Sequence, residues 1–595
     1  MTDLKTPIPG PVPQNASGSD MPGQAGSGFP GGPGTPPGPG RPGGPGGPPP
    51  GPQFPKRRRI TKDTPWNVPI DPIPAEKILH TYAADAVVVG HGYGGITACR
   101  ELTEQGFHVI LLESQTEEAY RPIGNAMGAL NATFTRERGV KDIDPIEFYR
   151  NWMLNSAYTV NQTLIMKFAQ NSGEAIDWYM SECTEEDKAT MHIQYYPRNE
   201  TIRSKVKDNV GAFKFWSSSV DCYGRCGQTQ IHKYNRDLCK RLGAEFIFGA
   251  HACQLVQNDR GKVTGVVAEM TDGTYIQANG DAVILATGGF GANREMCRDL
   301  LKDREAMCYG KDPASSAGGD CDGSGIQMAS WIGGKLDPWP IPTMNGKMCN
   351  PSLPQGIWLD RNGFRFCDEF CGPLELRGRQ TLTMNRDKFY AIFDSHLPEN
   401  LEYTPPSHTA VDPTPENIAS VRRLMAEALE PEDAKKGRAP MFCPGVSLKL
   451  IGAETLEELV VKFNCSDKVK ANILASVRRW NAHCETGRDE DYGRDTDVMY
   501  PIKDGPFFAE EITDVKVSRF LCTLGGLVVD GEQRVLGDRY DPIPGLFATG
   551  ACTSGKFALD YFTPIFGASL GINITLGREC GRSAAKYLRG ELNFD

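Results

Sequence analysis

A glycine-rich loop with the spacing G-x-G-x-x-G occupies residues 90–95 (GHGYGG), directly after the apolar residues 86–89. Such a loop at the start of a helix binds phosphate, because bare backbone N–H groups and the positive end of the helix face the anion. In this arrangement Gly90 makes the tight turn, Gly92 lets a pyrophosphate approach the backbone, and Gly95 allows the helix to pack closely on the strand. The spacing therefore predicts a dinucleotide site.

A carboxylate follows at the distance that a ribose would need. Residues 109–112 predict a second buried strand, which ends at Glu113, 18 residues past Gly95. With the helix that starts at Gly95 and closes at Gly106, the two strands form a βαβ unit of about 30 residues. Because an acid at this point can accept hydrogen bonds from ribose hydroxyls, we favour dinucleotide binding over a loop that only turns the chain.

Two further apolar strands run into glycine-rich turns, at residues 281–289 and 546–550. Either turn could be purely structural, but their order along the chain favours a shared site with the first motif. The other expected elements are an antiparallel hairpin of residues 264–268 and 274–277, a strand at 527–529, and helices at about 416–429, 456–463, 469–484 and 567–588.

Composition separates the start of the chain from the rest. Residues 1–55 hold 17 of the 44 Pro and 15 of the 66 Gly without a strict G-X-Y period, which predicts a disordered tail and excludes collagen. The remaining residues, about 540, exceed the roughly 100 to 200 of a single domain, so we expect at least two domains. The basic run at residues 56–59 (KRRR) is interpreted as a solvated charge cluster rather than a nuclear address.

Charge and cysteine usage exclude several classes of protein. The net charge is −10 although residues 56–59 add four positive charges, so the rest of the chain is acidic, which argues against a nucleic-acid-binding body. The 18 Cys are scattered, as expected in a reducing compartment, and no pair has a second pair at zinc-site distance, so no metal is expected. Without an 18-residue apolar run or a signal peptide, we expect a cytoplasmic protein with no membrane span.

Six motifs in a fixed order, over about residues 80–590, resemble the fumarate reductase and succinate dehydrogenase flavoprotein superfamily. That superfamily also contains 3-ketosteroid dehydrogenases and bacterial FAD-dependent enoate reductases. The motifs are residues 90–95, 124–128 (GNAMG), 286–290 (ATGGF), 322–326 (DGSGI), 365–369 (RFCDE) and 542–550 (PIPGLFATG).

The resemblance implies an α/β fold with a Rossmann-like FAD-binding domain built from both chain ends and an inserted α+β capping, or substrate, domain. The division would be a disordered Pro/Gly-rich tail at residues 1–62, the FAD-binding domain at 63–337 and 511–595, and the capping domain at 338–510. Covalent FAD in that superfamily uses a His in the loop around Asn125, and this loop has none, so FAD is expected to bind non-covalently.

The resemblance also implies a place for each part of the cofactor. Residues 124–128 would lie along the isoalloxazine ring, Thr287 and Gly288 by the adenosine half, and Gly550 near the ribityl chain. The expected FAD contacts are Gly90, Gly92, Gly94, Gly95, Glu113, Ser114, Gly124, Asn125, Met127, Gly128, Ala252, Thr287, Gly288, Gly550, Ala568, Ser569 and Leu570.

Departures from the dicarboxylate reductases of the superfamily bear on the substrate. Those enzymes bind carboxylates with His and Arg side chains, whereas here Cys522 precedes Thr523, no His precedes residues 342–343, and Pro398 and Pro564 stand at the Arg positions. Each lost charge-assisted hydrogen bond would cost a buried carboxylate roughly 1.5 to 3 kcal/mol. Fumarate and succinate are therefore not expected as substrates.

The remaining catalytic candidate is Tyr561, which stands ahead of the terminal helix like the tyrosines of related enoate reductases and ketosteroid dehydrogenases. With Gly567 it would bind the substrate carbonyl, and its phenol would act as acid or base. The alternative is a buried aromatic residue bonded to backbone. Arg386 could replace the missing anchors and His396 the missing proton donor, although an exposed side chain is the usual interpretation of each.

We therefore expect an FAD-dependent oxidoreductase that reduces, or forms, a C=C bond conjugated to a carbonyl in a largely neutral, steroid-like or aromatic small molecule. The reaction would be hydride transfer at flavin N5 with Tyr561 as acid or base. A second dinucleotide motif and a haem-attachment C-x-x-C-H are absent from the sequence, so electrons would pass to or from an external carrier. The alternatives are a 3-ketosteroid dehydrogenase working oxidatively and a flavin-binding protein without turnover.

Overall fold

The computed structural model describes residues 65–193, 209–210, 213–222, 226–301, 321–339, 341–344, 353–370, 388–402, 415–432, 450–513, 522–558, 561–562 and 564–594. The expected tail at residues 1–62 lies outside this part. Within it, no helix combines the length and the apolar character needed to cross a membrane.

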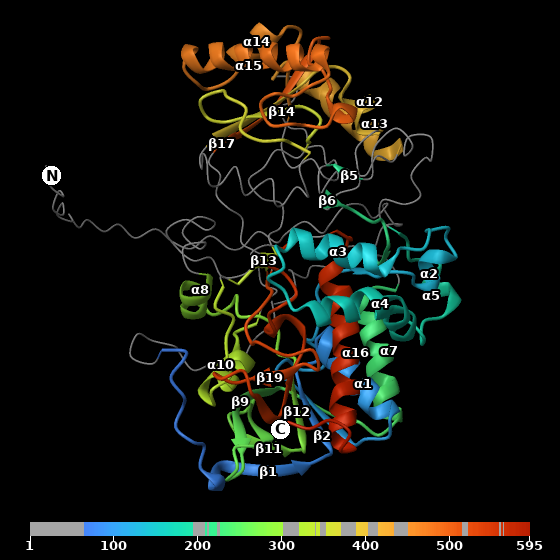
Figure 1. The fold of residues 1–595 in the computed structure, drawn as a ribbon, viewed down its shortest axis with the longest axis vertical. Helices are drawn as coiled ribbons and strands as arrows, with labels where there is room; N and C mark the ends of the chain where they lie inside the picture. Colours follow the sequence, from blue (N-terminus) through green and yellow to red (C-terminus); the bar gives the residue numbers. More distant parts are fainter. Residues whose placement is uncertain are drawn as a thin grey trace, which may run out of the picture.

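A six-stranded, mostly parallel sheet forms the centre of the lower part of the molecule in Figure 1. Its inner strands are rich in Val, Ile and Leu because both faces of the sheet are covered. The antiparallel edge strand β19 and its neighbour β20 come from the end of the chain, so segments far apart in sequence share one sheet. In sheet order the strands are β19 (Arg534–Leu536), β20 (Pro542–Ala548), β12 (Ala282–Leu285), β2 (Ala86–Val89), β3 (Val109–Glu113) and β8 (Glu245–Phe248).

Helix α1 (Tyr93–Glu104) connects β2 to β3 and packs against the terminal helix α16 (Ala568–Leu588), as Figure 1 shows. A Cβ at Gly577 would meet the backbone oxygen of Gly94 at 2.5 Å, so the two helices approach at glycines. The expected start of α1 at Gly95 is two residues late, because Gly92 has extended backbone and already caps the helix. The other helices of this part are α2 (Thr133–Arg136), α3 (Pro145–Asn155), α4 (Gln162–Tyr179), α5 (Glu185–Lys188), α7 (Gln228–Arg241), α8 (Arg294–Leu301) and α10 (Ser324–Trp331).

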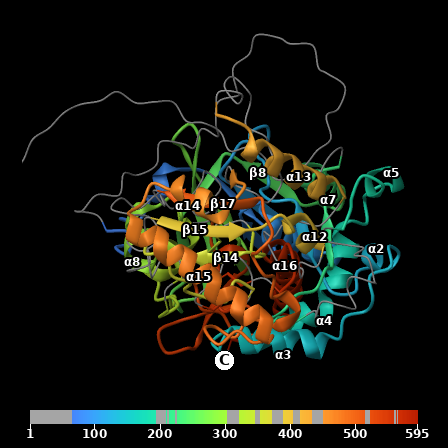
Figure 2. The ribbon, with the colours of Figure 1, turned by 90° about the horizontal axis from the view of Figure 1, so that it is seen from above.

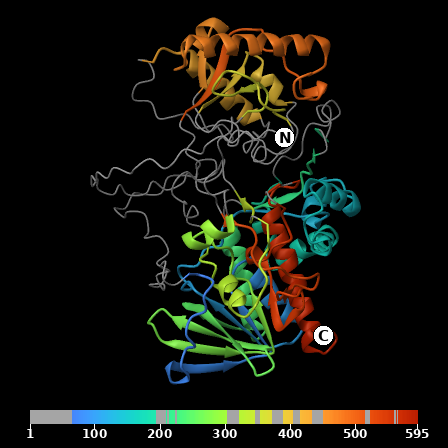
Figure 3. The same ribbon diagram turned by 60° about the vertical axis from the view of Figure 1, so that its left-hand side comes forward.

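A four-stranded sheet lies beside the parallel one, at the bottom of Figures 1 and 3. It confirms the predicted hairpin and adds a strand from the residues that precede the first predicted strand. The expected strand at residues 527–529 does not form as a ladder, because Leu527 and Val529 make only isolated bridges. The sheet consists of β1 (Ile78–Ala83), β11 (Tyr275–Asn279), β10 (Val263–Met270) and β9 (Ala250–Gln257).

A second lobe, at the top of Figures 1 and 3, contains another four-stranded sheet. Residues of β15 alternate between two apolar clusters, one with α13 and the other with α14 and α15, so helices cover both faces (Figure 2). The predicted helices of this region are confirmed within a few residues. The elements are β14 (Ile357–Leu359), β15 (Lys388–Phe393), β17 (Phe507–Thr513), β16 (Leu450–Ala453), α12 (Leu397–Glu402), α13 (Pro415–Leu429), α14 (Leu456–Val461) and α15 (Asp467–Thr486).

Short elements complete the described chain. Two of them recur below: β4 pairs with β7 next to the N-terminus of α16, and η3 follows β20. They are η1 (Ala75–Lys77), β4 (Ala126–Gly128), β5 (Asn209–Val210), β6 (Phe213–Lys214), β7 (Ser219–Asp221), β13 (Thr343–Met344), η2 (Thr496–Val498), β18 (Cys522–Thr523) and η3 (Gly550–Cys552).

Candidate functional site

The glycine loop between β2 and α1 is closely packed on one side and open on the other. A Cβ at Gly90 would lie 2.4 Å from the backbone oxygen of Ala286, and one at Gly95 would lie 1.8 Å from the oxygen of Gly90. A Cβ at Gly92, in contrast, would meet nothing within 4 Å. The two packed glycines shape the turn, and Gly92 leaves its backbone accessible, as binding of a pyrophosphate requires.

Glu113 ends β3 beside this loop and is hydrogen-bonded to it. Its carboxylate accepts the N–H of His91 at 2.9 Å and the N–H of Gln115 at 2.8 Å, while the Ser114 hydroxyl donates at 3.2 Å. Burial raises the pKa of Glu113, and these hydrogen bonds offset part of that rise. The carboxylate is thereby oriented, and Oε2, which accepts one of these three bonds, keeps capacity to accept a ribose hydroxyl.

The two later glycine-rich turns meet the first loop, as their order in the sequence suggested. Gly90 packs against residues 286–287, and a Cβ at Gly94 would lie 3.1 Å from Thr549 and 3.3 Å from the backbone nitrogen of Gly550. Gly550 has φ +79° and open space on its Cβ side. The Thr549 hydroxyl is buried without a hydrogen-bond partner, so a polar group is available where the loops converge.

Strand β4 of the expected isoalloxazine loop lies against the start of α16. The N–H of Gly128 donates to the oxygen of Gly567 at 3.0 Å, and a Cβ at Gly571 would lie 1.8 Å from the oxygen of Gly128. A Cβ at Gly124 would touch Leu570 at 3.0 Å. The structure thus brings together residues 124–128 and 567–571, which are more than 400 positions apart in the sequence.

Tyr561 lies close to the same helix end. Its hydroxyl oxygen accepts the N–H of Ser569, in the first turn of α16, at 3.4 Å, and its ring makes an edge contact with Phe557 at a centroid distance of 4.9 Å. The side chain is buried, and this burial raises the pKa of its phenol far above the ordinary value. The phenol is therefore neutral at physiological pH.

A family profile described as an FAD binding domain matches residues 85–559, most of the chain. The chain belongs to the fumarate reductase and succinate dehydrogenase flavoprotein superfamily. This flavoprotein is an FAD-dependent oxidoreductase, as the sequence predicted.

Several curated relatives match almost the whole flavoprotein. A vinyl phenol reductase of Lactiplantibacillus plantarum is 24% identical over 526 residues, which cover 84% of this chain and 96% of the relative. A digoxin reductase of Eggerthella lenta is 25% identical over 85% of this chain and 87% of its own length. A 4-oxocyclohexanecarboxylate 2-dehydrogenase of Sinomonas cyclohexanicum reaches 30% identity but covers only 56% of this chain and 55% of its own length.

Solved structures show the same fold. The 3-ketosteroid-Δ4-(5α)-dehydrogenase of Rhodococcus jostii, solved with 4-androstene-3,17-dione, superimposes with a TM-score of 0.62 at 22% identity, over 87% of this chain and all of that chain. An open form of a flavocytochrome c3 fumarate reductase gives a TM-score of 0.54 at 18% identity, over 88% of this chain and 82% of that chain.

Of the other expected FAD contacts, Met127 and Ala252 are buried, whereas Thr287 and Gly288 are half-buried. Met127 is fully buried in an apolar cluster, and Ala252 is buried within β9. Thr287 and Gly288 follow Ala286 just past the end of β12, and a Cβ at Gly90 would lie 3.3 Å from the Cα of Thr287.

Sequence reasoning missed two residues that the structure connects with the glycine-rich turns. Tyr93, which was not singled out in the sequence, donates its hydroxyl to the oxygen of Ile123 at 3.0 Å and ties the glycine loop to the loop at residues 124–128. Lys556, a lone cation in a run of small residues, is buried behind Gly550. His91 is a core residue, packed on Tyr120 at a ring-centroid distance of 4.4 Å.

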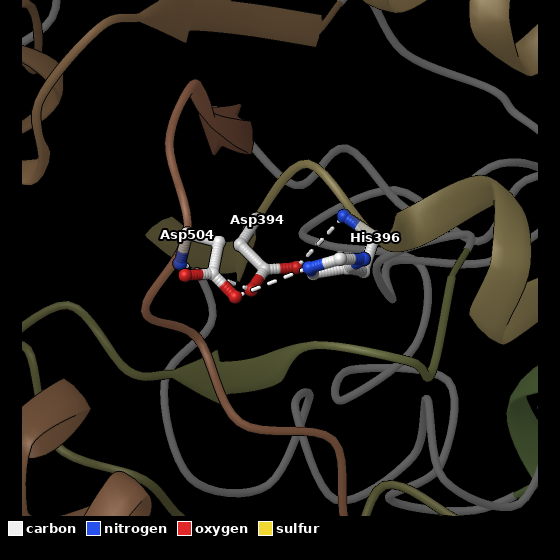
Figure 4. Close-up of side chains that lie close together, drawn as sticks. All are labelled: Asp394, His396 and Asp504. Carbon is white, nitrogen blue, oxygen red and sulfur yellow. Dashed lines mark hydrogen bonds and ion pairs between the residues drawn. The ribbon is translucent and has the colours of Figure 1, made fainter.

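His396 lies in the second lobe, where β15 leads into α12. Figure 4 shows it with Asp394 and Asp504. Its Nε2 is 3.1 Å from an oxygen of Asp504, and both side chains are more than half exposed. Asp394 accepts backbone N–H groups of His396, Lys503 and Asp504, so it braces the loop.

The structure therefore places His396 in an exposed ion pair of the second lobe. The cluster with Asp394 and Asp504 is close enough for a metal ion, but loop hydrogen bonds already explain it. Arg386 lies outside the described residues.

The residues that replace the dicarboxylate anchors have structural partners. The hydroxyl of Thr523 accepts the N–H of Phe290 at 2.8 Å, and the oxygen of Pro564 accepts the N–H of Trp216 at 2.7 Å. Cys522 pairs through β18 with Met344 of β13. These positions therefore supply backbone and sulfur where the dicarboxylate enzymes are expected to supply cations.

Proposed function

We propose that this flavoprotein reduces a C=C bond conjugated to a carbonyl or an aromatic ring in a largely neutral, steroid-like or aromatic substrate. The observation that carries the proposal is Tyr561, a buried, neutral phenol at the N-terminus of α16 and beside the loop at residues 124–128. The names of relatives that act on a vinyl phenol and on digoxin support the same substrate class.

Tyr561 supplies the acid that such a reaction needs. When bound, FAD supplies the electron pair, and the carbon next to the one that receives it must gain a proton. The phenol of Tyr561 carries such a proton at neutral pH, since the ordinary pKa of a tyrosine is about 10 and burial raises it further. The N–H groups of Ala568 and Leu570, in the first turn of α16, are placed to hydrogen-bond a carbonyl and stabilise the negative charge that develops on it.

The surroundings of Tyr561 favour a neutral substrate over a dicarboxylate. Its ring contacts Phe557, and the same apolar core contains Phe562 and Trp152, whose ring centroids are 5.1 Å apart. Because a carboxylate buried against such residues would lack charged partners, it would lose several kcal/mol of binding free energy, at about 1.5 to 3 kcal/mol per missing bond.

Three further points complete the proposal. FAD is held non-covalently, because residues 124–128 contain no His. The second lobe belongs to a substrate cap at residues 338–510, which is inserted into an FAD domain made from both chain ends. Electrons come from an external carrier.

The test is anaerobic reoxidation of the dye-reduced enzyme by a panel of acceptors, followed by flavin absorbance. We expect a vinyl phenol or a 3-keto-4-ene steroid to reoxidise it faster than fumarate does. Faster reoxidation by fumarate would contradict the proposed substrate class, and no reoxidation by any compound would indicate a binding protein.

Substitution Tyr561→Phe tests the acid. We expect turnover to fall by about 10² to 10⁴-fold with FAD still bound, because the ring stays in place and only the proton donor is lost. Tyr540→Phe, at an exposed tyrosine, is the matched control. Unchanged turnover in Tyr561→Phe would exclude the phenol as the acid.

A further inference from the structure

Lys556 is a buried cation immediately behind the loop that ends β20. Only 1% of the residue is exposed. Its ammonium donates to the backbone oxygen of Gly550 at 2.5 Å, to the oxygen of Thr553 at 2.6 Å, and to the hydroxyl of Thr553 at 2.7 Å. All three donor positions of the ammonium are therefore used, and the side chain closes the turn η3.

None of these partners is an acid, which is unusual for a buried lysine. A buried charge without a counter-ion is costly, and such groups are almost always paired. The titratable group that faces Lys556 among the described residues is the thiol of Cys552, whose own pKa is raised by burial. Burial lowers the pKa of Lys556 to about 8, so it is still mostly protonated at neutral pH.

The position of the ammonium connects it with the cofactor site. Its acceptor Gly550 lies against Gly94 of the glycine loop, and a Cβ added at Gly550 would meet nothing within 4 Å. The indole N–H of Trp152 donates to the backbone oxygen of Lys556 at 3.0 Å, which fixes the main chain at this point. The peptide group of Gly550 thus separates the Lys556 ammonium from the point where the glycine-rich turns meet.

We propose that Lys556 is a positioning residue of the FAD site: it holds the turn at Gly550, and its positive charge supplies the counter-ion for the bound cofactor. The diphosphate is anionic, and reduction by two electrons with uptake of one proton adds a further negative charge to the isoalloxazine ring. A nearby fixed cation favours both forms. The inference rests on FAD binding and not on the substrate proposed above.

The test is the midpoint potential of the bound FAD, measured at pH 7 by dye equilibration without substrate. We expect Lys556→Met to lower the potential and to weaken FAD binding by about tenfold or more. Lys556→Gln can still donate hydrogen bonds, so it should retain more FAD affinity than Lys556→Met yet show the lowered potential. Because no substrate is present, the result is independent of the proposed reaction.

Lys388→Met is the matched control, since Lys388 is a partly buried lysine of the second lobe paired with Glu511. It should leave the potential unchanged. If both Lys556 variants bind FAD at the wild-type potential, Lys556 only fills the turn and the proposal is wrong. If Lys556→Met does not retain FAD, the potential of Lys556→Gln decides.

Discussion

The region around the glycine loop and the second lobe differ in how their interiors are packed. Around the glycine loop the chain removes side chains, so that backbone meets backbone at Gly90, Gly95 and Gly571. In the second lobe it buries charges. Arg365 lies 2.8 Å from both Glu369 and Asp489, and its guanidinium lies 4.5 Å from the centre of the Trp480 ring.

The difference reflects what each region must accommodate. A site for a large cofactor needs backbone N–H groups and open space, and any Cβ in the wrong place takes that space away. The second lobe fills its own interior, so its charged groups can be paired within the protein. Arg494, fully buried, joins the same network 3.5 Å from Glu369 and donates to the oxygen of Gly356.

Gly95→Ala should have the largest effect, because it adds a side chain where the backbone is closely packed. The new methyl would lie 1.8 Å from the backbone oxygen of Gly90, where neither partner can move without disrupting β2 or α1. We expect loss of soluble, FAD-containing protein, measured by expression yield and flavin content.

Gly92→Ala is the matched control for that prediction. Its methyl meets nothing within 4 Å, so the variant should fold and lose only FAD affinity. A Gly95→Ala protein with normal flavin content would show that the loop is less rigid than its packing indicates.

Arg365→Met should have the next largest effect, in the second lobe. It leaves Asp489 and Glu369 buried with fewer cations, and breaking a buried pair costs about 3 to 5 kcal/mol of unfolding free energy. Chemical denaturation monitored by tryptophan fluorescence would measure this loss.

His396→Gln is the companion variant, because the pair of His396 with Asp504 is exposed and contributes at most about 1 kcal/mol. Similar losses for the two variants would refute the distinction between buried and exposed pairs in this lobe.

Asp221 tests the same contrast outside the second lobe, because it is a buried acid without a strong cation partner. It lies on β7, paired with Ala126 of β4, and its Oδ2 is 3.6 Å from Nε2 of His192. Burial raises its pKa to about 7. The folded protein therefore holds a proton that the unfolded chain releases above about pH 4.

Because the pKa of Asp221 is raised in the folded protein, its contribution to the free energy of unfolding falls as the pH rises. The stability that the protonated Asp221 contributes is complete below about pH 4 and is lost as the pH rises through about 7. Asp221→Asn has no such loss, so its stability relative to wild type should rise by about 2 to 3 kcal/mol between pH 5 and pH 8. Thermal unfolding at both pH values measures it, and a pH-independent difference would contradict the pKa.

Much of the cofactor region could be predicted from the sequence. The strands at residues 86–89 and 109–112, the glycine loop and Glu113 follow from local patterns, because burial of a strand and the steric demands of a tight turn act on neighbouring residues. The terminal helix was predicted for the same reason. The strand expected at residues 527–529 failed because pairing of strands depends on partners elsewhere in the chain.

By itself, therefore, the sequence determined the FAD fold and the glycines that shape it. Only the tertiary structure decided which groups with chemistry meet: Tyr561 with the first turn of α16, His396 with Asp504, and Lys556 with Gly550. The physical reason is that burial and distance, which set the charge and reach of a titratable side chain, arise from segments far apart in the sequence.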